Sequence, residues 1–477
     1  MNTRNGRTGR SGWVLAVGMS LAALPAAAPF VRAEEPPGAE ASKAEPKKDE
    51  STAPTTRPAT QPTTRPAAKA ISEQVNKALG WLAKNQRDDG GWDQGEMTKD
   101  GIRGGEAEGS NIADTCMAAL AFVRSGHTAK DAEHAATVRK ALDFVCGQVE
   151  KATQDGLSIT DIRTTRLQSK LGQHIDTFAA ALLLAEVRDK MPDEASRKRV
   201  IAALDKVMDK IEKNQKEDGR WVDANDGWAS VLCNAVANKA VFTAAQNGQP
   251  VSEAVISKAQ RYAAAQYDQK SGAVAGAGSA NVELYARAAN LGAFQDADNA
   301  NQKREGALIQ QQAKASEQVA QARADLLLLG KSSPATAPAA AEARKKLDEA
   351  SATVVAINGT INEIQANGRN LRGAQQQVLT RLDDKGFVAG FGSNGGEEFL
   401  SYMNIGESLW LKGGEDWAKF DKEMTGNLNR IQNPDGSWSG HHCITGRTFC
   451  TSAAVLTLTV DRSPVPVAEK VKEAKGK

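Results

Sequence analysis

Three acidic residues stand where an acid could do chemistry, each at the start of a segment that is apolar on most sides. Asp114 and Asp176 each precede such a segment, and Glu397 begins a third. A carboxyl group in this setting can act as a general acid or base, so we take these three residues as candidate catalytic residues. The competing interpretation is that Asp114 and Asp176, which are each followed by Thr, cap helices by accepting free backbone N–H groups.

Other polar side chains near the same segment starts could bind a ligand. Imidazole, carboxylate and guanidinium groups supply hydrogen bonds and charge to a ligand. The candidate ligand-binding residues are His174, Glu398, His441, His442 and Arg447. Cys443 and Cys450 lie in the same part of the chain, and a disulfide between them is plausible in an oxidising compartment.

One short pattern occurs three times with identical spacing: Gln, then Asp-Gly, then Trp. Asp-Gly reverses the chain, Gln can bond backbone groups at neighbouring helix ends, and Trp covers apolar surface while its indole N–H finds a partner. Repeats at this spacing predict stacked helical hairpins, and the pattern itself is structural rather than catalytic. The copies are Gln86, Asp89 and Trp92; Gln215, Asp218 and Trp221; and Gln432, Asp435 and Trp438.

Apolar spacing predicts twelve helices of two alternating kinds. One kind carries a single apolar stripe, whereas the other is apolar on nearly every side and must be buried on every side. Their alternation predicts an outer and an inner layer. The predicted ranges are 72–87, 111–125, 134–151, 174–190, 193–215, 227–247, 252–267, 280–297, 370–383, 396–412, 415–432 and 447–460.

Residues 300–382 form an insertion in this array. Apolar residues recur there in alternating steps of four and three on both sides of a break at Pro334 and Pro338, which predicts an antiparallel coiled-coil hairpin. The insertion separates four hairpins in 71–299 from two in 383–462. It either packs back on these hairpins or serves as an arm for a protein partner or for self-association.

The Gln-Asp-Gly-Trp pattern resembles the QW repeat of squalene and oxidosqualene cyclases, which the β subunits of protein prenyltransferases carry in a related form. The resemblance implies an all-α fold, namely an (α/α)6 toroid of six helical hairpins, with the insertion added as a coiled-coil hairpin. It also implies that inner helices line a central cavity and that their N-terminal ends surround its mouth. In the cyclases the repeat braces the outer helices and does no chemistry.

The same resemblance bears on the candidate chemistry. The segment from Asn111 to Thr115 is similar to the D-x-D-D-T segment with which squalene-hopene-type cyclases protonate a substrate, but only Asp114 keeps an acid of that motif. Protein prenyltransferases hold zinc near the start of the last inner helix, where this chain has Cys450. A zinc site made of Cys450, Glu397 and either His441 or His442 is therefore possible, although we expect no cofactor.

The two ends of the chain differ from its middle. Residues 1–33 read as a signal peptide, because Arg residues precede an apolar run and a small-x-small cleavage site. Residues 34–70 are rich in Pro, Thr and Lys and predict a disordered linker, and 463–477 a disordered tail. We expect an exported protein, periplasmic or extracellular, without a transmembrane helix after signal removal. A net charge of +2 does not favour nucleic acid as a partner.

Two observations decide the expected function: the structural repeat is complete, whereas the catalytic motifs of the families that it resembles are incomplete in this chain. We expect a binding or scaffolding module that holds an apolar, peptide or glycan ligand in its cavity. The first alternative is a terpenoid cyclase or prenyltransferase-like enzyme with an altered active site. The second is a polysaccharide-active enzyme that pairs Asp176 with Glu397 or Glu398 across the cavity.

Overall fold

The computed structural model describes residues 68–96, 109–130, 133–329, 337–390 and 394–464. Over these residues the chain is all-helical, with 69% helix and no strand, so the all-α prediction is confirmed. The expected signal peptide and nearly all of the linker and tail lie outside the described residues. Among the helices that are described, none has the length and apolar character needed to cross a membrane.

Ten of the twelve predicted ranges match observed helices closely, whereas 280–297 and 370–383 are the first part of α9 and the last part of α10. Two short helices, α4 and α11, were not predicted. The bounds are α1 Glu73–Lys84, α2 Ile112–Arg124, α3 Ala135–Lys151, α4 Arg166–Leu171, α5 Ile175–Val187, α6 Glu194–Lys213, α7 Ser230–Gln246, α8 Glu253–Ala265, α9 Glu283–Leu329, α10 Ala337–Arg381, α11 Lys385–Ala389, α12 Gly396–Lys412, α13 Gly414–Ile431 and α14 Arg447–Leu458.

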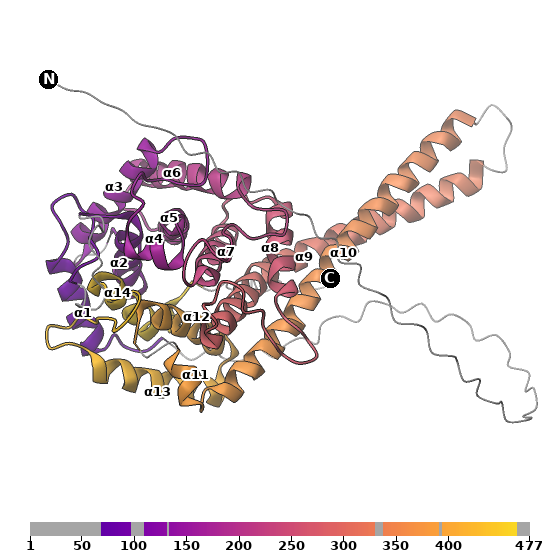
Figure 1. Cartoon of the computed structure of the whole chain (residues 1–477). Helices are drawn as coiled ribbons and strands as arrows, with labels where there is room; N and C mark the ends of the chain where they lie inside the picture. The colour runs from indigo at the N-terminus through magenta and orange to yellow at the C-terminus, as the bar shows by residue number, and fades with distance from the viewer. Residues whose placement is uncertain (1–67, 97–108, 131–132, 330–336, 391–393, 465–477) are drawn as a thin grey trace, which may run out of the picture. The chain divides into compact units, whose positions relative to one another are not determined.

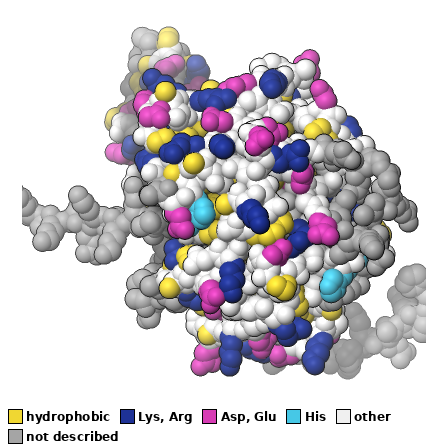
Figure 2. Space-filling view, turned by 90° about the vertical axis from the view of Figure 1, so that its left-hand side faces the viewer, with side chains coloured by type: hydrophobic (Ala, Val, Ile, Leu, Met, Phe, Trp, Pro, Cys, Tyr) yellow, Lys and Arg dark blue, Asp and Glu magenta, His cyan; other side chains and the backbone are white. Residues whose placement is uncertain are grey.

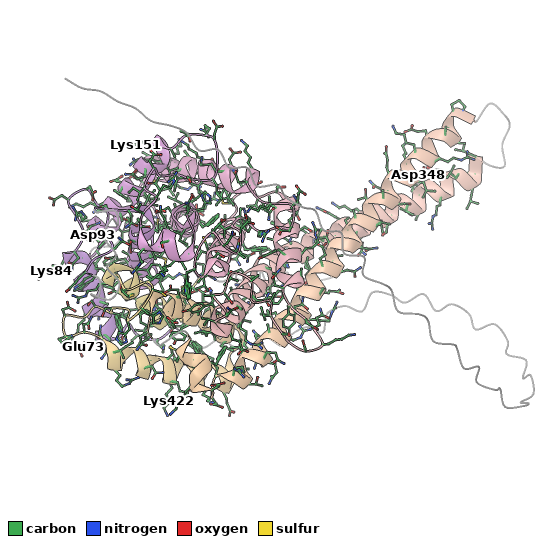
Figure 3. The ribbon with its side chains drawn as sticks, in the orientation of Figure 1. Glu73, Lys84, Asp93, Lys151, Asp348 and Lys422 are labelled. Atoms are coloured by element: carbon green, nitrogen blue, oxygen red, sulfur yellow. The ribbon has the colours of Figure 1, made fainter. Side chains whose placement is uncertain are left out.

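Six helices form an inner layer: α2, α5, α7, α12, α14 and the first part of α9. Every residue of α2 and of α5 is buried, as their apolar sequences require. Consecutive inner helices pack on one another, and α14 packs on α2, so the contacts close into a cycle. The amphipathic helices α1, α3, α6, α8 and α13 lie outside them (Figure 1). Labelled charged side chains of the outer helices, such as Glu73 and Lys422, project from the rim (Figure 3).

Each repeat copy makes the same set of hydrogen bonds. In the first copy, Trp92 Nε1 donates to Leu82 O (2.8 Å), and Trp92 N donates to Thr115 Oγ1 in α2 (2.9 Å). Gln86 Nε2 donates both to Gly90 O (2.8 Å) and to Thr137 O in α3 (2.9 Å). Through its Gln and Trp residues, the repeat thus joins the end of one outer helix to the next inner and the next outer helix.

The other two copies repeat this arrangement, and the third joins α13 to α1. Their indole donors bond Ile211 O and Leu428 O, and their Gln side chains bond Gly219 O with Val255 O and Gly436 O with Gln74 O. Gly436 has φ +91°, and a Cβ there would lie 2.7 Å from Lys77 O of α1, so only glycine fits. The last outer helix is therefore fastened to the first.

The helices α9 and α10 are long and pair in antiparallel fashion. Arg381 pairs with Glu283 at one end, and Gln312 donates to Asn358 nearer the other. Residues buried along the pair recur every seven positions, as the heptad spacing predicts: Ala315 and Ala322 in α9, and Ala343, Ala350, Ile357, Ile364 and Leu371 in α10. The far halves of both helices extend away from the other helices (Figure 1). The boundary expected at residue 300 instead falls inside α9, which continues without a break from the inner layer.

Candidate functional site

The N-terminal end of α12 carries two fully buried acids. Glu398 Oε2 accepts a hydrogen bond from Gly395 N (3.0 Å) and lies 3.5 Å from His442 Nε2, while Tyr285 of α9 donates its hydroxyl to Oε1. Glu397 Oε2 accepts from Ile444 N (3.2 Å). Glu397 Oε1 has no hydrogen-bond partner among the described residues. Glu397 is thus the acid of this pair with an uncommitted oxygen.

Burial sets the protonation of this cluster. It raises the pKa of Glu397 to about 8, and the neighbouring charge of Glu398 adds to the effect. Burial likewise raises the pKa of the Cys443 thiol to about 11 and that of the Tyr285 hydroxyl beyond its usual range. Near neutral pH, Glu397 is mainly a neutral carboxylic acid and Cys443 an unreactive thiol. This cluster can donate hydrogen bonds but offers no nucleophile.

A cation and an exposed aromatic ring lie beside this acid cluster. The α4 helix starts with a capping box, in which Thr165 and Gln168 satisfy each other's backbone N–H. Lys170 near its end lies with Nζ 5.3 Å from the centre of the Trp228 ring, and its charge acts on both Glu397 and Cys443. Trp228 is 38% exposed, and it is the one large aromatic side chain left exposed in the described part of the chain.

Asp114 and Asp176 are buried at the starts of α2 and α5, where they accept hydrogen bonds from neighbouring groups. Asp176 Oδ1 accepts from Ala113 N (3.0 Å) and its Oδ2 from Gln168 Nε2 (2.7 Å), so this acid caps the neighbouring helix α2. Asp114 Oδ2 accepts from Asn111 Nδ2 (2.8 Å). Burial raises the pKa of Asp176, and it raises the pKa of Asp114 to about 8. For Asp176 the capping interpretation fits both carboxylate oxygens.

The remaining predicted ligand-binding residues do not gather at one place. His174 Nδ1 lies 3.2 Å from Ser158 Oγ, and burial lowers its pKa. His441 is exposed, and its backbone N–H donates to Asn394 O. Arg447 donates to Ser437 Oγ (2.9 Å), pairs with Asp435 of the third repeat, and lies over the Trp81 ring at 5.1 Å. Arg447 therefore braces a repeat rather than lining the Glu397 cluster.

The described residues form neither the zinc site nor the disulfide that the sequence allows. Among described residues, Glu397, His441 and Cys450 do not bring their ligand atoms together; the one group of potential ligands that comes together is His127, Glu133 and His134. Cys443 and Cys450 are both free thiols. The Cys450 thiol is fully buried and donates to Ile444 O at 3.4 Å. In this structure the start of the last helix is therefore held by packing and hydrogen bonds rather than by a disulfide.

Sequence reasoning missed a buried ionic cluster at the opposite ends of the inner helices. Arg124 of α2 pairs with Glu186 of α5 (2.6 Å) and with Glu407 of α12. Lys239 of α7 pairs with the same Glu407 and with Asp296 of α9 (2.8 Å). All five side chains are at most one-tenth exposed. The signal in the sequence that could have revealed this cluster is a single charged residue in the second half of an otherwise apolar helix.

Each of the three acids in this cluster pairs with at least one of its two cations. Burial alone would raise the pKa of Glu407, but Lys239 and Arg124 lower it to about 2. Burial raises the pKa of Asp296 to about 6 against the opposing effect of Lys239. In the cycle of inner helices, α2 and α7 are not immediate neighbours of α12, so these pairs reach across the interior. They close the inner layer at this end with charged side chains.

No known protein family matches this chain, and no curated protein is significantly similar to it.

Proposed function

We propose that this chain is an exported (α/α)6 toroid of the squalene-cyclase and prenyltransferase repeat type, and that it acts as a binding module rather than a terpenoid enzyme. The observation that carries the proposal is the weakness of its acids. Protonating an alkene requires a very strong acid, whereas burial raises the pKa of Asp114 and of Glu397 to about 8. The closed cycle of inner helices and the fastening of α13 to α1 support the toroid.

The interior also favours binding over terpenoid chemistry. A cyclase or prenyltransferase needs an apolar, aromatic-lined cavity for its hydrocarbon substrate, but Arg124, Lys239 and Glu407 occupy the interior at one end. A polysaccharide-active enzyme would need Asp176 as one of two opposed acids. Both oxygens of Asp176 already accept hydrogen bonds from Ala113 and Gln168. Asp176 is therefore not available as the second acid of the polysaccharide-active alternative.

The surface around Trp228 is the proposed ligand site. An exposed Trp with a Lys over its ring offers a flat apolar face next to a hydrogen-bonding cation, a combination that suits a peptide or a glycan. Glu397 and Tyr285 belong to the neighbouring helix ends, whose N–H groups favour acceptor groups of a ligand. The ligand therefore docks at the N-terminal ends of the inner helices, where the mouth of the toroid lies.

Quenching of tryptophan fluorescence during titration with glycan and peptide libraries tests this site. We expect saturable binding that Trp228→Ala abolishes and Lys170→Met weakens. Trp81→Ala is the matched control, because Trp81 also lies under a cation, Arg447, but away from the site. Binding that survives Trp228→Ala, or that is lost equally in Trp81→Ala, contradicts the placement.

The outer part of α9 and α10 is the proposed arm for a protein partner or for a second copy. Ile309, Leu327, Leu328 and Val355 are all at least 50% exposed there, and they are the large aliphatic side chains with the most exposure among described residues. On the face shown in Figure 2, positive and negative side chains are interspersed. This supports a protein or small-ligand role rather than one on nucleic acid.

A further inference from the structure

The connector between α2 and α3 brings two of the chain's five histidines together. His127 and His134 meet edge to face, with ring centres 4.7 Å apart and an angle of 80° between the rings. Glu133 Oε1 lies 3.9 Å from His134 Nε2. One ligand atom from each of the three residues lies within 4.8 Å of the other two. This cluster is separate from the proposed ligand site, since it follows the opposite end of α2.

Local structure holds both imidazoles in place. The α2 helix ends in a Schellman motif: Gly126 has φ +97° and donates to Val123 O (3.1 Å), while His127 N donates to Phe122 O (3.0 Å). His134 begins α3, and its side chain makes no capping bond there. Its ring packs on Phe122, with centroids 4.9 Å apart. Both imidazoles are therefore attached to ordered backbone, one just after the end of α2 and the other at the start of α3.

We propose that His127, His134 and Glu133 form a binding site for a divalent transition-metal ion, with Zn²⁺ as the best-matched ion. Two imidazoles and one carboxylate are a ligand set that zinc accepts, at bond lengths of about 2.0–2.2 Å. Tetrahedral coordination places ligand atoms about 3.3 Å apart. Closure from the observed spacing of up to 4.8 Å therefore takes at most about 1.5 Å of movement. Glu133 can supply it, because its side chain is 77% exposed.

The surroundings favour a cation over a simple contact between two rings. The carbonyl groups at the C-terminal end of α2 carry partial negative charge close to the site. Arg139 donates a hydrogen bond to Ala129 O (2.8 Å), and this bond also anchors the connector between α2 and α3. Because Glu133 is exposed, the fourth coordination position faces solvent. The bound ion would clamp the start of α3 to the end of α2 and keep a position open for water or an external ligand.

The test is calorimetric titration of Zn²⁺ into the chain, purified without a polyhistidine tag and treated with a chelator. We expect one equivalent to bind. Glu133→Ala should weaken binding by at least about tenfold without touching the core, and His127→Ala should abolish it. His441→Ala is the matched control, because it removes an exposed histidine elsewhere. Circular dichroism of each variant checks folding.

A second readout is thermal: an ion that binds the folded chain alone raises its melting temperature as the Zn²⁺ concentration rises. The proposal is overturned if wild type binds no zinc under these conditions. It is equally overturned if zinc binds as well to His127→Ala and Glu133→Ala as to wild type. Zinc that is lost in Cys450→Ser but kept in these two variants would also overturn it and would locate the metal at the last inner helix.

Discussion

Single residues in this chain show how burial decides what an acid can do. Glu397 and Asp114 are acids in a position suited to catalysis, and their sequence context marks both as candidates. Burial raises both pKa values, although the backbone N–H of Ile444, far away in sequence, opposes this effect at Glu397. The sequence therefore located the acids, whereas their weakness as acids required the packed structure.

The raised pKa of Glu397 has a consequence for stability. In the unfolded chain this acid loses its proton near pH 4.5, whereas in the folded chain it keeps it up to about pH 8. Across this interval the folded chain binds more protons, so its contribution to stability falls as pH rises. Glu397→Gln should therefore flatten the dependence of the unfolding free energy on pH between about pH 5 and about pH 9.

Urea unfolding at several pH values measures this effect. Asp348→Asn is the control, because Asp348 is exposed on the far part of α10 (Figure 3). Its profile should match that of wild type. Asp114 contributes in the same direction and remains in both variants, so part of the slope stays. An unchanged slope in Glu397→Gln would contradict the protonated state of this acid.

At the scale of helices and turns, the sequence predicted most of the architecture. The long apolar and amphipathic segments fixed the helix positions because tertiary packing reinforces their periodicity. The continuous α9 was not foreseen, since its stretch around Asp296–Asn301 is polar yet buried against other helices. The short α4 was missed because its capping box is its main local signal. The histidine cluster was missed because the first and last of its residues lie seven positions apart in a loop.

The turn after α8 lacks the Trp of the repeat, and a cavity lies beside it. Trp221 bonds to both α6 and α7. The turn after α8 resembles the repeat in having Gln266 and Gly272, but Val274 stands two positions after the glycine, where the three copies have Trp. A small cavity of about 40 Å³, partly open to solvent, lies between α7, α8 and α9 and is lined largely by alanines with Trp221 and Val274. Val274→Trp should fill it and raise the unfolding free energy by about 0.5–2 kcal/mol.

Thermal unfolding compared with Val274→Ala checks this. The alanine variant enlarges the cavity and should unfold at a lower temperature than wild type. Asn290 lines the same cavity, and its Oδ1 has no partner among the described residues, so the indole N–H has an acceptor nearby. A loss of stability in Val274→Trp would show that the helices cannot admit the ring.

At the scale of the whole molecule, the buried ionic cluster links five inner helices. Removing Arg124 leaves Glu186 without its cation in a desolvated interior and leaves Glu407 with Lys239 alone. Breaking such a pair costs about 3–5 kcal/mol, so Arg124→Met should lower the unfolding free energy by that amount. Arg199→Met is the matched control, since Arg199 is 40% exposed and pairs at the surface with Glu150. It should cost less than about 1 kcal/mol. Equal losses in urea unfolding would contradict the cluster's central role.

The fastening of α13 to α1 has a consequence for the order in which the chain folds. Val75 and Leu79 of α1 are buried, and α1 packs mainly on α14, which is the last helix along the chain. During synthesis the early hairpins can pair locally, but α1 lacks its partner until residues near 458 have emerged. Closing the cycle of helices therefore requires contacts between residues far apart in the sequence, and such contacts form slowly. The contact between α1 and α14 is therefore among the last to form. Until it forms, the apolar face of α1, including Val75 and Leu79, stays exposed to solvent in every incomplete chain.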